Sequence, residues 1–195
     1  MGYWGEYVVV RSDRPALEIA VLSDGRCREG HEIGLCDVGS FGDGWQVLSV
    51  CHALPGSPPE TVRQLGEETG APALSCYILD DDTGLIHGWS REGGSWRTWF
   101  HPKLAADYEM PSHICYEDET GMPSTAYLAA WEAAHSQIVD GMPARATQMA
   151  AWATEAGWTP DGAVLLNELL SDEIGFAQAQ FQVLLAAMGA PGAGP

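Results

Sequence analysis

A short acidic segment between two predicted strands has the composition of a cation site. Residues 80–84 read DDDTG, and a calcium loop offers acidic oxygens at alternate positions. Counted from Asp80, however, the fifth position is Gly84 and the twelfth is Arg91, where such a loop needs oxygen ligands. Asp and Gly also favour tight turns, because they tolerate left-handed backbone conformations. We therefore expect a hairpin bend, with a weak cation site as the alternative.

A second group of residues has the types that bind zinc. Cys27, His31 and Cys36 could be joined by Cys51 or His52 as a fourth ligand. The spacings are not those of compact zinc knuckles, and adjacent residues on a strand point to opposite faces, which excludes a Cys51–His52 catalytic dyad. We expect free thiols, no metal and no cofactor, with zinc as the alternative.

Aromatic and imidazole side chains are concentrated in residues 73–101, where short runs joined by turns predict a β-meander. Alternation places Leu85, His87 and Trp89 on one strand face, and we expect Trp96, Thr98 and Phe100 to form the matching face of the next strand. Such a cluster is either ordinary core or a ligand pocket. The candidate pocket residues are His87, Trp89, Trp96 and Trp99. The weak candidates for a general base are His87 and His101.

Two classes of phosphate site are excluded by the sequence. Lys103 is the only lysine and no Gly-Lys-Ser/Thr motif occurs, so there is no P-loop. The glycines at 39, 42 and 44 do not match a dinucleotide fingerprint and precede a predicted strand. A Schiff-base mechanism would have to use Lys103 itself.

Charge is the most uneven feature of the chain. Its 195 residues carry 27 acids and 9 Lys or Arg, a formal net charge of −18. Residues 104–195 contain 12 of the acids and a single base, Arg145. Binding to nucleic acid or to an anionic membrane needs a basic surface, and we expect neither. The acidic half is either a solvated surface or the binding face for a basic protein.

The start of the chain has no basic segment followed by a long apolar run, and no stretch approaches the roughly 18 apolar residues that span a bilayer. We expect a cytoplasmic protein.

Hydrophobic periodicity predicts an α+β fold. Strands are expected at Tyr7–Arg11, which should be central, at Leu17–Leu22 and at Trp45–Cys51, with a long loop at Ser23–Gly44. Ser57, Pro58 and Glu60 predict the start of a helix that ends before Gly70. The body is thus a mainly antiparallel sheet with one or two helices over residues 1–115.

From Ser124 the apolar period changes to that of helices. One helix should end near Gly141, a second should span Pro143–Gly157, and others should start at residues 159–161 and 171–173. The expected organisation is a linker at 116–123, a helical part at 124–189 packed on the body, and a frayed tail at 190–195.

Three stretches carry a resemblance to a known family. They are MGYWGEYVVVRSDRP (1–15), GWQV (44–47) and EETGAPAL (67–74). Together they resemble uncharacterised proteins of high-GC actinobacteria, and the low ratio of Lys to Arg agrees with such a source. The resemblance implies no activity and no catalytic residue.

The functional expectation is an acidic binding protein, such as an inhibitor or immunity-type protein for a basic partner. The partner-binding candidates are Glu117, Asp118 and Glu119. The alternative is a small-molecule enzyme that uses the aromatic and histidine pocket of residues 73–101.

Overall fold

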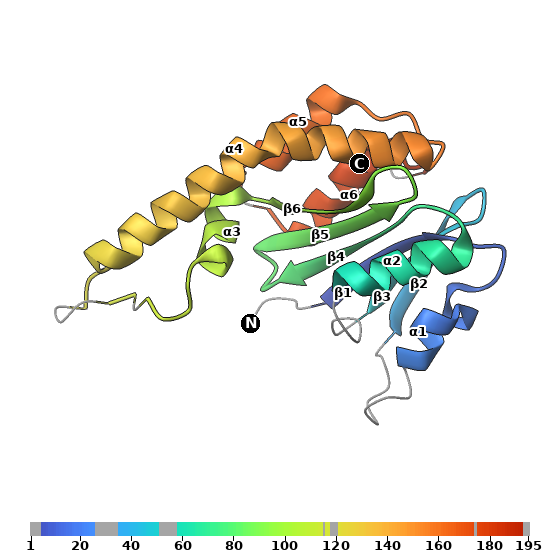
Figure 1. Ribbon diagram of the computed structural model, residues 1–195, viewed down its shortest axis with the longest axis horizontal. Helices are drawn as coiled ribbons and strands as arrows, with labels where there is room; N and C mark the ends of the chain where they lie inside the picture. The colour runs from blue at the N-terminus through green and yellow to red at the C-terminus, as the bar shows by residue number, and fades with distance from the viewer. Residues whose placement is uncertain are drawn as a thin grey trace.

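The structure is a computed structural model that describes residues 5–25, 35–50, 58–114, 116–117, 121–173 and 175–192. The described strands form one antiparallel sheet in the order β2-β3-β1-β4-β5-β6 (Figure 1). Their bounds are β1 Gly5–Arg11, β2 Leu35–Gly42, β3 Trp45–Val50, β4 Ala73–Leu79, β5 Thr83–Ser90 and β6 Gly94–Phe100. The α+β class with an antiparallel sheet is confirmed.

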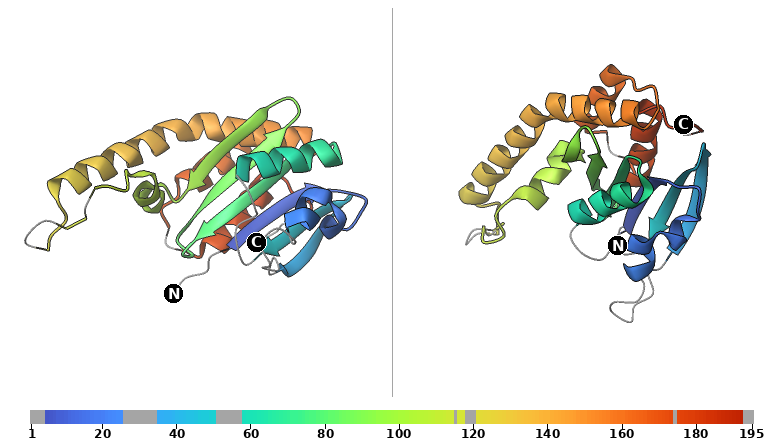
Figure 2. Two further views of the ribbon diagram at one scale, coloured as in Figure 1. Left: turned by 60° about the horizontal axis from the view of Figure 1, so that its bottom comes forward. Right: turned by 45° about the vertical axis from the view of Figure 1, so that its right-hand side comes forward.

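Helices cover both faces of this sheet (Figure 2). One face is covered by the 3₁₀ turn η1 (Ala16–Glu18), α1 (Ala20–Gly25) and α2 (Pro58–Thr69). The other face is covered by α4 (Thr125–Glu155), α5 (Gly162–Leu170) and α6 (Ala177–Ala187). A further helix that the sequence did not predict, α3 (Pro102–Glu109), follows β6 and lies beside the first part of α4.

Strand β1 is central, as expected from its apolar residues on both faces. It pairs with β3 on one side and β4 on the other. Val8 and Val10 pack with α1 and α2, whereas Val9 packs with the core on the opposite face, and all three are fully buried. A strand buried on both faces can form only when both helical layers are in place.

Two expectations for the first half of the chain are wrong. Leu17–Leu22, predicted as a strand, contains η1 and the start of α1, because Ile19 and Leu22 are buried at helical spacing. The Glu68 carboxylate accepts hydrogen bonds from the N–H groups of Ala20 and Val21 and so caps this helix. Part of the predicted loop Ser23–Gly44 forms β2, which gains a full partner strand in β3.

Helix α4 is continuous where the sequence predicted two helices. Pro143 removes one backbone hydrogen bond from a helix interior, which usually breaks or kinks it. Here the Pro143 ring lies on the solvent side, and Met142, Ala146 and Met149 on the other side are buried against the core. Burial of these three side chains contributes more to stability than the missing backbone hydrogen bond costs. Helix α6 likewise begins at Ala177, later than the predicted start at residues 171–173.

Trp152 joins the helical part to the sheet. Its Nε1 donates to the carbonyl oxygens of Ala73 and Trp89, at 3.1 and 3.0 Å, and only 1% of the residue is exposed. Its ring lies 5.9 Å from that of Trp45 and 5.4 Å from that of Trp158, measured between centroids. One side chain thus binds β4, β5 and β3 to α4.

None of the helices in the described ranges combines the length and the apolar character needed to cross a membrane.

Replacing Trp152 with Phe should lower the free energy of unfolding by about 2–4 kcal/mol, because it leaves two buried carbonyls without their donor and opens a cavity. Urea unfolding monitored by circular dichroism measures the change. The matched control is Trp131→Phe on the exposed part of the same helix, which should cost less than about 1 kcal/mol. Equal decreases in the free energy of unfolding of the two variants would contradict the role of Trp152 in holding α4 on the sheet.

Candidate functional site

The DDDTG segment is a hairpin turn, as predicted. Asp80 and Asp81 have φ of 52° and 66°, in the left-handed region that Asp tolerates, and they are the two central residues of a β-turn from Leu79 to Asp82. The N–H of Asp82 donates to the Leu79 oxygen at 3.0 Å, and the Asp81 oxygen accepts the N–H of Ala177 at the start of α6. Burial, and then the charges of Asp82 and Asp80, raise the pKa of the Asp81 carboxyl. The turn therefore serves as an attachment point for α6.

Four of the five residues proposed for zinc lie outside the described part of the chain: Cys27, His31, Cys51 and His52. The fifth, Cys36, lies in β2, but its side chain is not described. Elsewhere in the described ranges, no three side chains of His, Cys, Asp or Glu come together in a way that could hold a metal.

The expected common face of the meander is wrong. Strand pairing places Trp96 opposite Gly88, and Thr98 opposite Ile86. Directly paired residues share a face, so Trp96 lies on the face covered by α4–α6, while His87 lies on the face covered by α2. Alternation within one strand cannot fix the register with its neighbour.

The four proposed pocket residues and His101 occupy separate places. Trp89 packs on Gly66 of α2, where a Cβ would come within 2.1 Å of the indole ring. Trp99 donates from Nε1 to Glu109 Oε1 at 2.6 Å and stacks on Tyr108. His101 lies at the beginning of α3, and its Nδ1 is 2.6 Å from the backbone oxygen of Asp82. These contacts are structural, and they divide the predicted pocket.

His87 is a buried neutral base. It is 5% exposed and lies between Ser75 and Arg97 in the strand pairing. Burial first, and then the positive charge of Arg97, lower its pKa to about 4. Its Nδ1 and the Ser75 Oγ have no hydrogen-bond partner among the described residues. Such a group affects the pH dependence of stability, because the unfolded chain protonates more readily.

The acidic residues proposed for partner binding lie next to a projecting structure. Glu117 is exposed and forms a β-bridge with Pro123, while Asp118 and Glu119 lie outside the described residues. We define the arm as α3 together with Tyr116, Glu117 and residues 121–141. In Figure 1 the first part of α4 extends beyond the sheet, with α3 beside it.

Tyrosine contacts stabilise the arm from within. Tyr127 donates from Oη to Asp107 Oδ1 at 2.5 Å, which joins α4 to α3. This hydrogen bond is the main cause that raises the pKa of Tyr127 to about 12. The ring of Tyr116 meets that of Tyr127 edge-on, 4.7 Å between centroids, and Lys103 pairs with Asp172 at 2.8 Å to attach α3 to the segment after α5.

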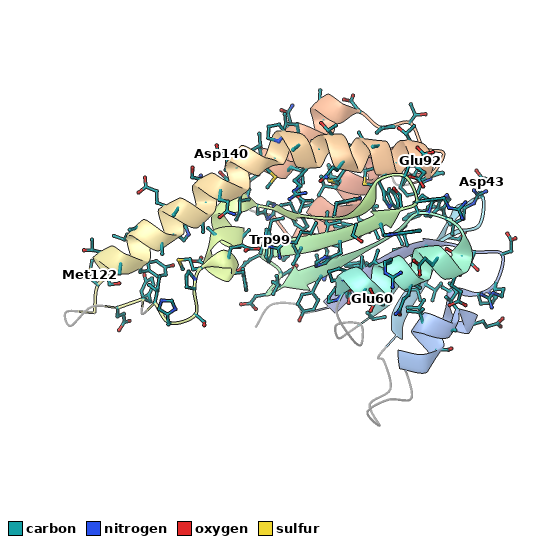
Figure 3. All side chains as sticks on the ribbon, viewed as in Figure 1. Asp43, Glu60, Glu92, Trp99, Met122 and Asp140 are labelled. Atoms are coloured by element: carbon teal, nitrogen blue, oxygen red, sulfur yellow. The ribbon has the colours of Figure 1, made fainter. Side chains whose placement is uncertain are left out.

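The surface of the arm is both apolar and acidic. No residue of α4 between 125 and 141 is fully buried. Figure 3 draws the side chains of this region as sticks and labels Met122 and Asp140 on the arm. Five of the eight large apolar side chains that are well exposed in the described residues belong to the arm: Leu104, Tyr108, Tyr116, Met122 and Leu128. The described residues of the arm include five acids and one base, Lys103; the acids are Asp107, Glu109, Glu117, Glu132 and Asp140. The sequence indicated the acids but not the exposed apolar surface, and two of its residues, Leu104 and Tyr108, lie in α3, which was not predicted.

The comparisons with known proteins give no match for this chain, whether with family models, with curated proteins or with solved structures.

Stability should fall as pH decreases from about 6.5 toward 4, because in this window the unfolded state binds a proton at His87 and the folded state does not. The contribution of His87 is present in full only well above pH 6.5, and about 2 kcal/mol of it is lost by pH 5. Urea unfolding of the wild type and of His87→Asn over this range measures it.

The variant should show a shallower pH dependence than the wild type. The control is His113→Asn, the same substitution at an exposed histidine. If the two variants have the same slope, His87 does not carry the effect.

Proposed function

We propose that this protein binds a basic protein through the arm. The observation that carries the proposal is the coincidence, on one projecting structure, of exposed apolar side chains with five described acids against a single base, Lys103, which pairs with Asp172. A solvated acidic surface needs no exposed Tyr, Met and Leu, whereas protein interfaces are enriched in Tyr and Met.

The two kinds of residue would have different roles in binding. Acidic side chains such as Glu117, Glu132 and Asp140 would attract a basic surface at long range and accelerate association. Apolar side chains such as Tyr116 and Leu128, which are 52% and 53% exposed, would lose their contact with water in the complex. Tyrosines near the centre of an interface commonly supply a large share of the binding free energy, and the apolar residues around them exclude water.

An inhibitor or immunity-type role fits this chemistry. The surface of a nuclease that binds nucleic acid is basic, and an acidic, tyrosine-bearing projection could occupy it. A cytoplasmic location would suit such a role.

The enzymatic alternative loses its main support from the sequence. His87, Trp89, Trp96 and Trp99 do not line one pocket, because strand register places Trp96 on the other face of the sheet.

The test compares two triple variants with the same net charge. Glu117→Gln, Asp118→Asn and Glu119→Gln remove the three acids proposed for partner binding, and the control neutralises three exposed acids elsewhere, Asp13→Asn, Glu18→Gln and Glu92→Gln. Each protein is immobilised and exposed to an extract of the cells that produce it, and the retained proteins are identified.

We expect a basic protein that the wild type and the control retain and the arm variant loses. With the purified partner, the association rate should fall roughly tenfold or more between 50 and 300 mM salt. Leu128→Ala should raise the dissociation rate, with a cost above about 1 kcal/mol. Equal losses in the two triple variants would show that only net charge matters, and the arm proposal would then be wrong.

A further inference from the structure

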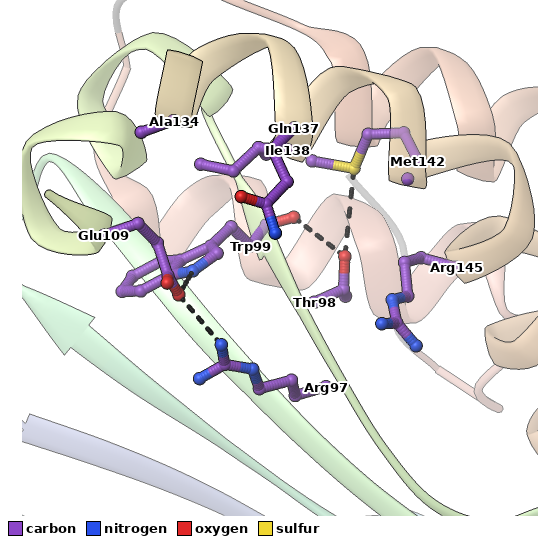
Figure 4. Close-up of a pocket in the computed structure, with 10 residues that line it drawn as sticks. Arg97, Thr98, Trp99, Glu109, Ala134, Gln137, Ile138, Met142 and Arg145 are labelled. Carbon is purple, nitrogen blue, oxygen red and sulfur yellow. Dashed lines mark hydrogen bonds and ion pairs between the residues drawn. The ribbon is translucent and has the colours of Figure 1, made fainter. Parts of the chain in front are cut away.

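A small pocket lies at the base of the arm, between β6, the end of α3 and the middle of α4 (Figure 4). Its volume is about 110 Å³, several times the roughly 10–15 Å³ that one water needs. It is therefore large enough for a ligand of a few heavy atoms and smaller than typical sites for drug-sized molecules.

Two arginines line this pocket in a chain that has few bases. Arg97 comes from β6 and Arg145 from α4, and Arg145 is the only Lys or Arg after residue 103. The one acid in the lining is Glu109, which pairs with Arg97 at 3.2 Å and also accepts the Trp99 indole N–H. The lining thus carries a formal charge of +1, whereas the whole chain carries −18.

Arg145 is the arginine whose charge is left uncompensated. It donates to the neutral amide oxygen of Gln148 at 2.7 Å, and it makes no salt bridge with any described residue. Arg97, in contrast, is already paired with Glu109. An anion entering the pocket would therefore gain most from Arg145, and Glu109 would oppose it.

The remaining lining residues favour a carboxylate with a short carbon chain. Figure 4 shows the Gln137 amide and the Arg145 guanidinium on the pocket side of α4, where both can donate hydrogen bonds. Ala134, Ile138 and Met142 form an apolar wall beside them. A guanidinium binds a planar carboxylate through two parallel hydrogen bonds, and a net charge of +1 matches a monoanion better than a phosphate dianion.

We propose that this pocket binds a small monocarboxylate, with the carboxylate on Arg145 and the carbon chain against Ile138 and Met142. This binding is separate from the association proposed for the arm. Its test uses no protein partner, so either proposal can fail without the other.

Butyrate is the probe, and butyramide and inorganic phosphate are compared with it at constant ionic strength. Isothermal titration and the shift in melting temperature report binding to the full chain. We expect butyrate to bind and to raise the melting temperature, and butyramide to do neither because it lacks the charge. Equal binding of butyramide, stronger binding of phosphate, or no binding of butyrate would overturn the proposal.

Three variants locate the site. Arg145→Gln should weaken butyrate binding at least tenfold, whereas Arg63→Gln, on the exposed surface of α2, should leave it unchanged. Glu109→Gln should strengthen binding several-fold, because it removes the opposing charge and keeps an oxygen that can accept the Trp99 N–H.

The gain expected from Glu109→Gln separates a ligand site from a structural role, since disruption of the fold would only weaken binding. Circular dichroism confirms that each variant is folded. Unchanged affinity in both Arg145→Gln and Glu109→Gln would show that butyrate binds elsewhere and would overturn the assignment.

Discussion

The indole of Trp152 is the contact on which the arrangement of the two parts of the molecule depends. It donates one N–H to carbonyls of two neighbouring strands, at Ala73 and Trp89, and its ring packs with Trp45 and Trp158. A buried donor shared between two acceptors is sensitive to displacement, because either carbonyl would be left buried and unsatisfied. The second half of α4 is thereby held at a defined position across β4 and β5.

Fixing one half of a long helix also fixes the direction of the other half. Helix α4 is continuous from Thr125 to Glu155, so the position of its buried part sets where its exposed part projects. Helix α3 supports the projection through the Tyr127–Asp107 hydrogen bond and the Tyr116–Tyr127 contact. The arm, and the pocket at its base, thus follow from the packing of the other end of α4 on the sheet.

Negative and positive charge are concentrated at different places on the molecule: acids on the arm and two arginines in the pocket at its base. The arm carries five described acids against one base, Lys103, and this excess costs stability through self-repulsion. At its base, Arg97 and Arg145 make one small region cationic. The same chain can therefore offer a surface for a basic macromolecule and, a short distance away, a pocket for a small anion.

Local sequence determined the features that depend on neighbouring residues. These include the central strand at Val8–Val10, the turn at Asp80 and Asp81, and the helix that ends before Gly70, because alternation, left-handed preference and helix-end preferences act over a few residues. The excess of acid after residue 103 was also evident from the sequence. The features that depend on contacts between residues far apart in the sequence were decided by the tertiary structure.

The register of β5 with β6 places Trp96 and His87 on opposite faces of the sheet. Burial of Met142 and Met149 stabilises α4 as one continuous helix through Pro143. The pairing with β3 made a strand of residues that the sequence predicted as loop. No local sequence pattern indicates that Arg97 of β6 and Arg145 of α4 line the same pocket, because the pocket forms only when the helix packs on the sheet.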